Sequence, residues 1–101
     1  MTVVFDIETN GLYHKATELH CISIKVDDNQ TKVYTSKHLK GSDGTIEEGL
    51  DILANADLLI GHNIINFDLP TIKKLYWWWG YKGKLIDTLI CTKLRYPYVV
   101  Q

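Results

Sequence analysis

Apolar and polar positions along the first third of the chain predict short strands separated by turns. The apolar run Val3–Phe5 continues through Asp6-Ile7-Glu8 and stops at Thr9-Asn10-Gly11, a typical turn sequence. Because its first residues are continuously apolar, we expect this strand to be buried on both faces of a sheet. The segments Leu19–Val26 and Thr31–Thr35 predict two further strands, joined as a hairpin by the polar residues between them.

The rest of the chain predicts helices alternating with strands. Thr45 and Glu48 have the spacing of a capping box, and an apolar stripe at helical spacing follows as far as Ala54. Pro70 suits the first turn of the next helix, and Gly80 and Gly83 lie beyond its end. The expected elements after the first helix are a strand, a helix, a strand and a last helix, at Leu58–Ile60, Phe67–Trp79, Lys84–Ile86 and Asp87–Arg95. Asp87 is the expected cap of this last helix.

This order predicts an α/β fold with a mixed sheet of about five strands. Strands that alternate with helices form right-handed parallel crossovers, whereas the first hairpin adds an antiparallel pair. The 101 residues suffice for one small domain, and 46% apolar with 23% charged residues argues against a disordered or fibrous chain. Two cysteines without metal-site spacing suggest buried thiols in a reducing compartment, and no secretory signal or membrane span is visible. We therefore expect a cytoplasmic location and no membrane partner.

Charge is distributed unevenly along the chain. Residues 1–68 carry a formal charge of -6 and residues 69–101 a charge of +5, although the net charge is only -1. The balance excludes a uniformly basic nucleic-acid clamp but allows a local basic patch, or simply a solvated basic face. Trp77-Trp78-Trp79 lies among lysines, as in surfaces that stack single-stranded nucleic acid. Alternatively, Trp79 belongs to the core, and Trp77 or Trp78 covers the helix end or a partner interface.

Three carboxylates form the candidate site. Asp6 and Glu8 are two residues apart on one strand, so their side chains share a face near its carboxyl end. Asp68 follows the strand Leu58–Ile60, and parallel pairing of the two strands would bring it to the same sheet edge. Crowded carboxylates repel unless neutralised, and hard oxygen ligands suit Mg²⁺ or Mn²⁺. Alternatively, Asp6 and Glu8 are a solvated strand end and Asp68 caps a helix.

Three segments resemble the DnaQ-like, or DEDD, 3'→5' exonucleases. Val4–Leu12, read VFDIETNGL, resembles their first exonuclease motif, and Gly61–Asp68, read GHNIINFD, resembles the second. Ile86–Leu89, read IDTL, resembles the Asp-Thr element that follows a later strand of these domains. With the strand that contains His20-Cys21, the set most resembles proofreading domains of phage-type family A DNA polymerases, although Gly61–Pro70 would also suit family B.

The resemblance implies an RNase H-like sheet that holds two ions of Mg²⁺ or Mn²⁺ and hydrolyses the 3'-terminal phosphodiester of single-stranded DNA. In this family pattern Asp6 would bridge both metals, with Glu8 and Asp68 helping to hold them. Leu12 would lie against the terminal base, unless it is plain core. The substrate-binding residues that the resemblance implies are Thr9, Leu12, Asn63 and Phe67.

The family's third motif, which supplies a fourth carboxylate and a Tyr or His, has no counterpart after Asp68. Asp87 is the only later acid, and it matches the Asp-Thr element. We therefore expect residues 1–101 to be a C-terminally truncated exonuclease domain of a phage-type polymerase, completed by a polymerase segment or second chain. The resemblance to phage-type polymerases implies that its cytoplasmic location is in a bacterial or phage-infected cell. The alternatives are a non-catalytic DNA- or protein-binding module derived from this fold, and a split gene product without a function of its own.

Overall fold

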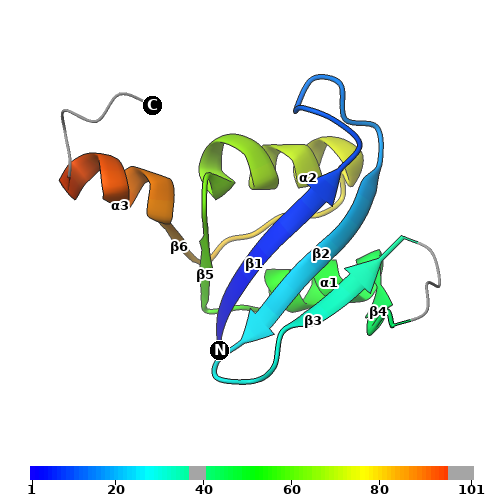
Figure 1. Cartoon of the computed structure of the whole chain (residues 1–101), viewed down its shortest axis with the longest axis horizontal. Coiled ribbons are helices and arrows are strands. Elements are labelled where there is room, and N and C mark those ends of the chain that lie inside the picture. Colours follow the sequence, from blue (N-terminus) through cyan, green and yellow to red (C-terminus); the bar gives the residue numbers. More distant parts are fainter. Residues whose placement is uncertain (37–40, 96–101) are drawn as a thin grey trace.

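The computed structural model describes residues 1–36 and 41–95, and the last four of these by their backbone alone. The strands are β1 (Thr2–Thr9), β2 (Leu19–Val26), β3 (Lys32–Thr35), β4 (Gly44–Thr45), β5 (Leu58–Gly61) and β6 (Lys84–Asp87). They form one sheet in the order β4-β3-β2-β1-β5-β6 (Figure 1). The β1–β2 and β2–β3 pairs are antiparallel and the other three are parallel, so the predicted mixed sheet is confirmed. The sequence predicted about five strands, and the additional one is β4. It has only two residues, too few to show an apolar pattern.

Helices follow the strands in the predicted order. The capping box of the first helix is confirmed, since the Glu48 backbone N–H donates to the Thr45 hydroxyl and the Thr45 N–H to the Glu48 carboxylate, both at 3.2 Å. A single π-helical turn, which the sequence pattern did not predict, precedes the second helix. The helices are α1 (Ile46–Ala54), the π-helical turn η1 (Ile64–Asp68), α2 (Leu69–Leu75) and α3 (Thr88–Arg95).

The core lies on one face of the sheet. In β1, Val3, Phe5 and Ile7 are buried, whereas Val4 is 44% exposed and the two acids of the strand are exposed. The prediction that β1 is buried on both faces is therefore wrong. Both parallel crossovers run in the same direction across the sheet, and right-handed crossovers then place α1 and α2 on the same face, behind β1 and β2 in Figure 1. The opposite face carries a row of neighbouring apolar residues: Val4, Ile60 and Ile86.

The second helix ends earlier than its apolar stripe predicts. The chain leaves the helix at Tyr76, where φ is -128° and ψ is 75°, so the prediction of a helix continuing to Trp79 is wrong. Trp79 is nevertheless buried in the core, and its indole N–H donates to the Leu50 carbonyl of α1 at 2.8 Å. Lys73 donates to the carbonyls of Trp77 and Trp79 at 2.9 and 2.8 Å, which satisfies backbone groups beyond the helix end.

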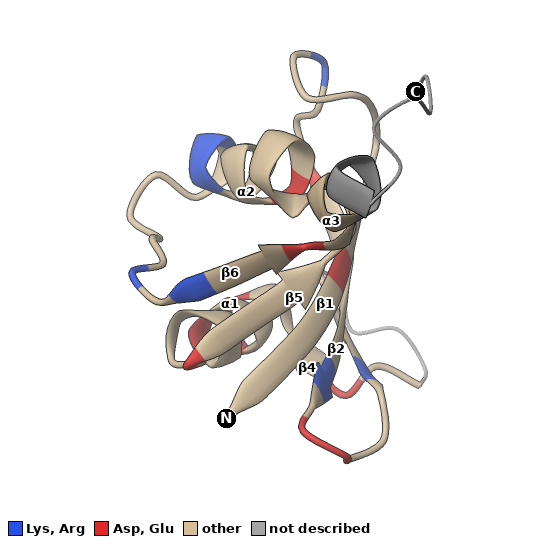
Figure 2. Ribbon diagram, turned by 90° about the vertical axis from the view of Figure 1, so that its left-hand side faces the viewer, with Lys and Arg blue, Asp and Glu red and all other residues tan. Residues whose placement is uncertain are grey.

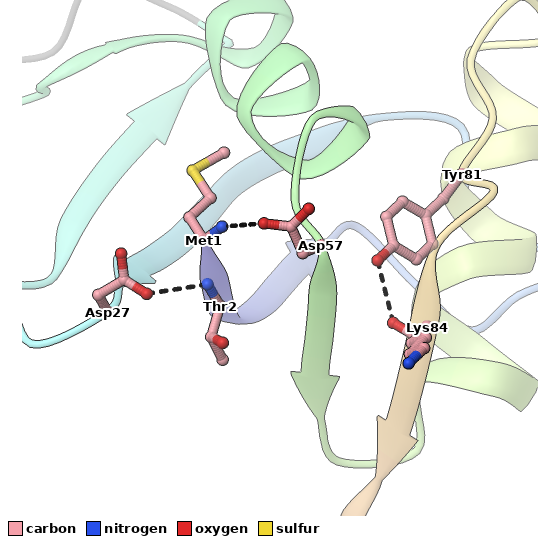
Figure 3. Close-up of polar contacts among 6 residues, drawn as sticks. All are labelled: Met1, Thr2, Asp27, Asp57, Tyr81 and Lys84. Atoms are coloured by element: carbon pink, nitrogen blue, oxygen red, sulfur yellow. Dashed lines mark hydrogen bonds and ion pairs between the residues drawn. The ribbon is translucent and has the colours of Figure 1, made fainter.

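Polar contacts hold the amino-terminal end of β1 (Figure 3). The Met1 ammonium donates to Asp57, which raises the pKa of the ammonium and lowers that of the carboxyl group. The Thr2 N–H donates to Asp27 at 2.9 Å, and near β6 the Tyr81 hydroxyl donates to the Lys84 carbonyl at 3.0 Å. The contacts with Asp57 and Asp27 tie the start of β1 to the residues that directly precede β5 and follow β2.

Membrane-spanning segments and the burial of cysteines both bear on the cellular compartment of a protein. None of the helices in residues 1–36 and 41–95 is long and apolar enough to cross a membrane. Cys21 is half-buried, but Cys91 is exposed, so the expectation of two buried thiols is wrong for Cys91. Its exposure follows from the position of α3, which projects from the edge of the sheet (Figure 1).

Gly61 stands where β5 meets η1, and the fold leaves no room for a side chain there. A Cβ atom at this position would lie 2.3 Å from Cγ2 of Ile64 and 2.9 Å from the carbonyl oxygen of Phe5. The Phe5 oxygen belongs to the backbone of β1 and cannot rotate away. Glycine therefore allows η1 to begin directly beside β1.

We expect Gly61→Ala to destabilise the chain by about 1–3 kcal/mol, because an added methyl group overpacks this junction. Gly80→Ala is the matched control, since nothing lies within 4 Å of a Cβ built there. Its effect should stay within about 0.5 kcal/mol. Urea unfolding of the two variants measures the difference, and equal costs would contradict the steric argument.

Candidate active site

The carboxyl end of β1 carries two acids on one face, as predicted. Asp6 and Glu8 alternate with the buried Phe5 and Ile7, and both are exposed. They lie opposite Ser23 and Cys21 of β2. The parallel ladder with β5 extends only to the Val4–Ile60 pair. Beyond that pair, the β5-facing edge of β1 is open to another segment.

That segment ends with Asp68, the last residue of η1. Its side chain is only 3% exposed, and the Ile7 backbone N–H donates to Asp68 Oδ2 at 3.2 Å. Because Ile7 lies between Asp6 and Glu8, this hydrogen bond holds Asp68 beside the acidic end of β1. The expected parallel pairing of the two strands is thus confirmed, and it brings Asp68 to the predicted sheet edge.

Burial and a neighbouring charge make Asp68 a weaker acid than an ordinary aspartic acid. Its pKa rises to about 7, chiefly because burial disfavours the charged carboxylate and secondly because Asp6 adds a negative charge. Hydrogen bonds from the backbone N–H groups of Ile7 and Asp68 oppose the rise, and Asp87 adds to it. In Figure 2 the acidic positions at the ends of β1 and β6 and near the start of α2 lie at one edge of the sheet.

The donor chemistry fits a divalent cation at Asp6 and Asp68. Their mutual repulsion is what a bound cation relieves, and carboxylate oxygens are preferred ligands of Mg²⁺ and Mn²⁺. A complete ligand set is not assembled, however: within residues 1–36 and 41–95, no group of three or more His, Cys, Asp or Glu side chains could hold a metal ion. The metal role predicted for Asp6, Glu8 and Asp68 together therefore stays a prediction.

Asp87 organises the segment that delivers Asp68. Its side chain is 4% exposed and accepts hydrogen bonds from the backbone N–H groups of Asn63, Ile65 and Leu89 at 2.9, 3.0 and 3.0 Å. Burial alone would raise the pKa of Asp87, but these donors and the Ile90 N–H outweigh it and lower the pKa. The bond from Leu89 confirms the predicted helix cap.

Sequence reasoning missed the hydrogen bonds that Asp87 accepts from Asn63, just before η1, and from Ile65 within it. The only indication of these bonds in the sequence is the Asp-Thr pair directly after a strand, and this pair does not identify the groups that hydrogen-bond to the carboxylate. Thr88 continues the same connection: its hydroxyl donates to the Gly61 carbonyl at 3.4 Å and lies 2.9 Å from Nδ1 of His62.

The residues predicted to contact substrate occupy different environments. Leu12 is 68% exposed, so the alternative that it belongs to the core is wrong. The Thr9 hydroxyl donates to the Gly11 carbonyl at 2.6 Å and shapes the turn after β1. Asn63 is half-buried and adopts a left-handed conformation, with φ of 58°, at the start of η1. Phe67 is partly buried against the core. Their contacts with substrate stay predictions.

Comparison with known proteins identifies the family. A family model described as RNase_H superfamily matches residues 3–99, so the chain belongs to the RNase H superfamily. The RNase H-like α/β fold inferred from the sequence is thereby confirmed. A search of curated proteins finds no match.

Three solved structures share the fold. The family B DNA polymerase from the hyperthermophilic archaeon Pyrobaculum calidifontis is 16% identical with a TM-score of 0.61, over 87% of this chain and 15% of that one. Brucella melitensis NrnC is 23% identical with a TM-score of 0.67, over 99% of this chain and 47% of that one. Exonuclease X, in complex with 5' overhanging duplex DNA, is 16% identical with a TM-score of 0.65, over 99% and 67%. The chain thus spans less than half the length of the first two.

The raised pKa of Asp68 predicts a pH-dependent stability of the metal-free chain. Between about pH 4, where an unfolded Asp ionises, and about pH 7, the folded chain holds a proton that the unfolded chain has released. Stability from this group therefore falls as pH rises through that window. We expect Asp68→Asn to remove the loss, so that its urea midpoint, relative to the unaltered chain, increases from pH 5 to pH 8 with a chelator present. Parallel pH profiles of the two proteins would contradict the assignment.

Asp87→Asn should destabilise the chain by about 2–4 kcal/mol, because an amide has one acceptor oxygen and its NH₂ group faces backbone donors. Asp27→Asn is the matched control: this exposed carboxylate accepts from the Thr2 N–H. We expect the control to cost less than about 1 kcal/mol. Denaturant unfolding at pH 7 gives both values, and similar costs would show that the burial of Asp87 is unimportant.

Proposed function

We propose that the chain is the N-terminal part of a DnaQ-like, metal-dependent 3'→5' DNA exonuclease domain. Its reaction would be hydrolysis of the 3'-terminal phosphodiester of single-stranded DNA, as proofreading within a phage-type DNA polymerase. The observation that carries the proposal is the bond from Ile7 to Asp68, which holds a buried acid beside Asp6 at the carboxyl end of the central strand. Fold neighbours that are a DNA polymerase and a DNA-bound exonuclease support it.

In this proposal Asp6, Glu8 and Asp68 hold Mg²⁺ or Mn²⁺. The bound ions supply an activated water and stabilise charge on the phosphate oxygens. The protein's contribution is positional: Ile7 fixes Asp68 through its backbone N–H, and Asp87 fixes the turn that carries Asp68. The side chain of Leu12, exposed on the loop that follows β1, would lie against the terminal base.

Full activity would require one more carboxylate and a Tyr or His. Asp87, the only acid after Asp68 in the sequence, has its oxygens occupied by backbone N–H groups, so in this proposal it does not supply that carboxylate. We therefore propose that a further polymerase segment or a second chain provides these groups.

The test is release of mononucleotides from 3'-labelled single-stranded DNA with Mg²⁺ or Mn²⁺. The chain is assayed alone and with candidate segments that carry the third motif. We expect chelator-sensitive release in at least one combination, reduced about a hundredfold or more by Asp6→Ala, since even outer-shell changes at metal sites cost 10–100-fold. Asp27→Ala, which removes an exposed acid at the other end of the sheet, should leave release unchanged.

Metal binding is measured separately by Mn²⁺ titration with electron paramagnetic resonance. Binding that is lost in both Asp6→Ala and Asp68→Asn but kept in Asp27→Ala supports the proposed site. If no combination releases nucleotides and Mn²⁺ binding is unaffected by these substitutions, the exonuclease proposal fails.

A non-catalytic DNA- or protein-binding module is the second candidate. The lack of an assembled three-ligand group among the described residues favours it. It predicts partner binding that needs no metal, together with no nucleotide release in any combination of chain and segment.

A further inference from the structure

A turn after α2 exposes two tryptophans. Trp77 is 79% exposed and Trp78 is 54% exposed, whereas Trp79 is buried. The core position considered for Trp79 is thus confirmed, and Trp77 is not used to cover the helix end. Central positions of turns usually hold small or polar residues that suit the backbone. Two large aromatic side chains at these positions contribute little to the core, which points to a role at the surface.

The turn is anchored at several points. The Trp79 N–H donates to the Tyr76 carbonyl at 2.9 Å, and the Trp79 indole N–H donates to Leu50 of α1 at 2.8 Å. Lys73 donates to the carbonyls of Trp77 and Trp79. The rings of Tyr76 and Trp78 meet edge to face, with centroids 6.0 Å apart. The backbone of the turn and the Trp78 ring are thus held in place, and a fixed ring binds a flat ligand with a smaller entropic cost than a mobile one.

Basic groups border the aromatic turn. Lys74 donates to the Tyr13 carbonyl at 2.7 Å and lies 5.4 Å from the centre of the Tyr13 ring. An ammonium has three donors, so this bond leaves capacity for a phosphate oxygen. Residues 69–86 include four lysines and no acid, and the basic positions of α2 and β6 lie on one side of the molecule in Figure 2. Burial and, after it, the negative charges of Glu47 and Glu18 raise the pKa of Tyr76, so we expect phosphates to lie away from Tyr76.

We propose that Tyr13, Lys74, Trp77 and Trp78 form an aromatic platform on which unpaired bases of single-stranded DNA stack. Aromatic faces suit bases of any sequence, and the lysines suit the phosphate backbone. Helix α2 links the platform to the candidate site, because Asp68 immediately precedes this helix and Lys74 lies in its last turn, about 9 Å along the axis at 1.5 Å per residue. The inference rests on the proposed function for the choice of DNA as ligand.

Binding is tested in a chelator, so that cleavage plays no part. The full chain is titrated with a twelve-nucleotide deoxythymidine oligomer at low salt, and binding is followed by fluorescence anisotropy of a label on the DNA. Because stacking on one aromatic side chain is worth about tenfold in affinity, Trp77→Ala and Trp78→Ala should each weaken binding about tenfold. Trp77→Phe should retain affinity within about threefold. Lys74→Ala should weaken binding a few-fold and reduce its salt dependence, whereas Lys32→Ala, on β3, should not.

An abasic oligomer of the same length distinguishes stacking from simple charge attraction. We expect it to bind weakly and to be insensitive to Trp77→Ala and Trp78→Ala. Equal binding of the abasic and deoxythymidine oligomers, or unchanged affinity in both tryptophan variants with normal circular dichroism, overturns the platform. The exonuclease proposal is judged separately by Asp6→Ala, which removes nucleotide release but should leave binding to the platform intact.

Discussion

The candidate site depends on the burial of one negative charge, that of Asp87. Its carboxylate accepts from backbone groups on both sides of the turn that starts η1 and from the first turn of α3. Ile65 and Asn63 precede Asp87 by 22 and 24 residues in the sequence. Several N–H groups directed at one carboxylate offset its loss of hydration, which keeps the group charged. Without that charge, the π-helical turn would lose the partner that orients it toward β1.

The pKa values of the two buried acids of the site are shifted in opposite directions: that of Asp87 is lowered and that of Asp68 is raised. Asp87 is surrounded by backbone donors, so its charged form is favoured. Asp68 has fewer donors and faces the negative charge of Asp6, so its pKa rises to about 7 and its neutral form persists in the acidic range where an ordinary Asp is ionised. One acid is thus suited to hold structure together, and the other is suited to respond to a cation or a proton. The same sheet edge combines a rigid support with a responsive group.

The sequence predicted most of the fold because its signals are local. Alternation of strands and helices, the Thr45–Glu48 box and the Asp87 cap involve residues close in sequence, and the structure confirms each of them. Three features depended on distant contacts and were not predictable. β4 is defined only by its pairing with β3, η1 by bonds to Asp87, and the early end of α2 by the contact of Trp79 with Leu50.

The site was predictable to a similar extent. Spacing placed Asp6 and Glu8 on one face, and strand order placed Asp68 at the same edge. The degree of burial of Asp68 was not predictable, because it results from packing of η1 against β1 around Gly61. The prediction for β1 failed for a related reason: an apolar run says that a strand can be buried on both faces, but the positions of the helices decide which faces are covered.

The apolar row on the uncovered face, Val4, Ile60 and Ile86, has a consequence for the chemistry of Asp6. Val4 and Asp6 are two residues apart on β1 and share that face, so whatever shields the row also removes water from the carboxylate. Removal of water strengthens the attraction between a carboxylate and a bound cation. Coverage of the hydrophobic surface and cation affinity are therefore thermodynamically linked, and each would change the other by the same factor.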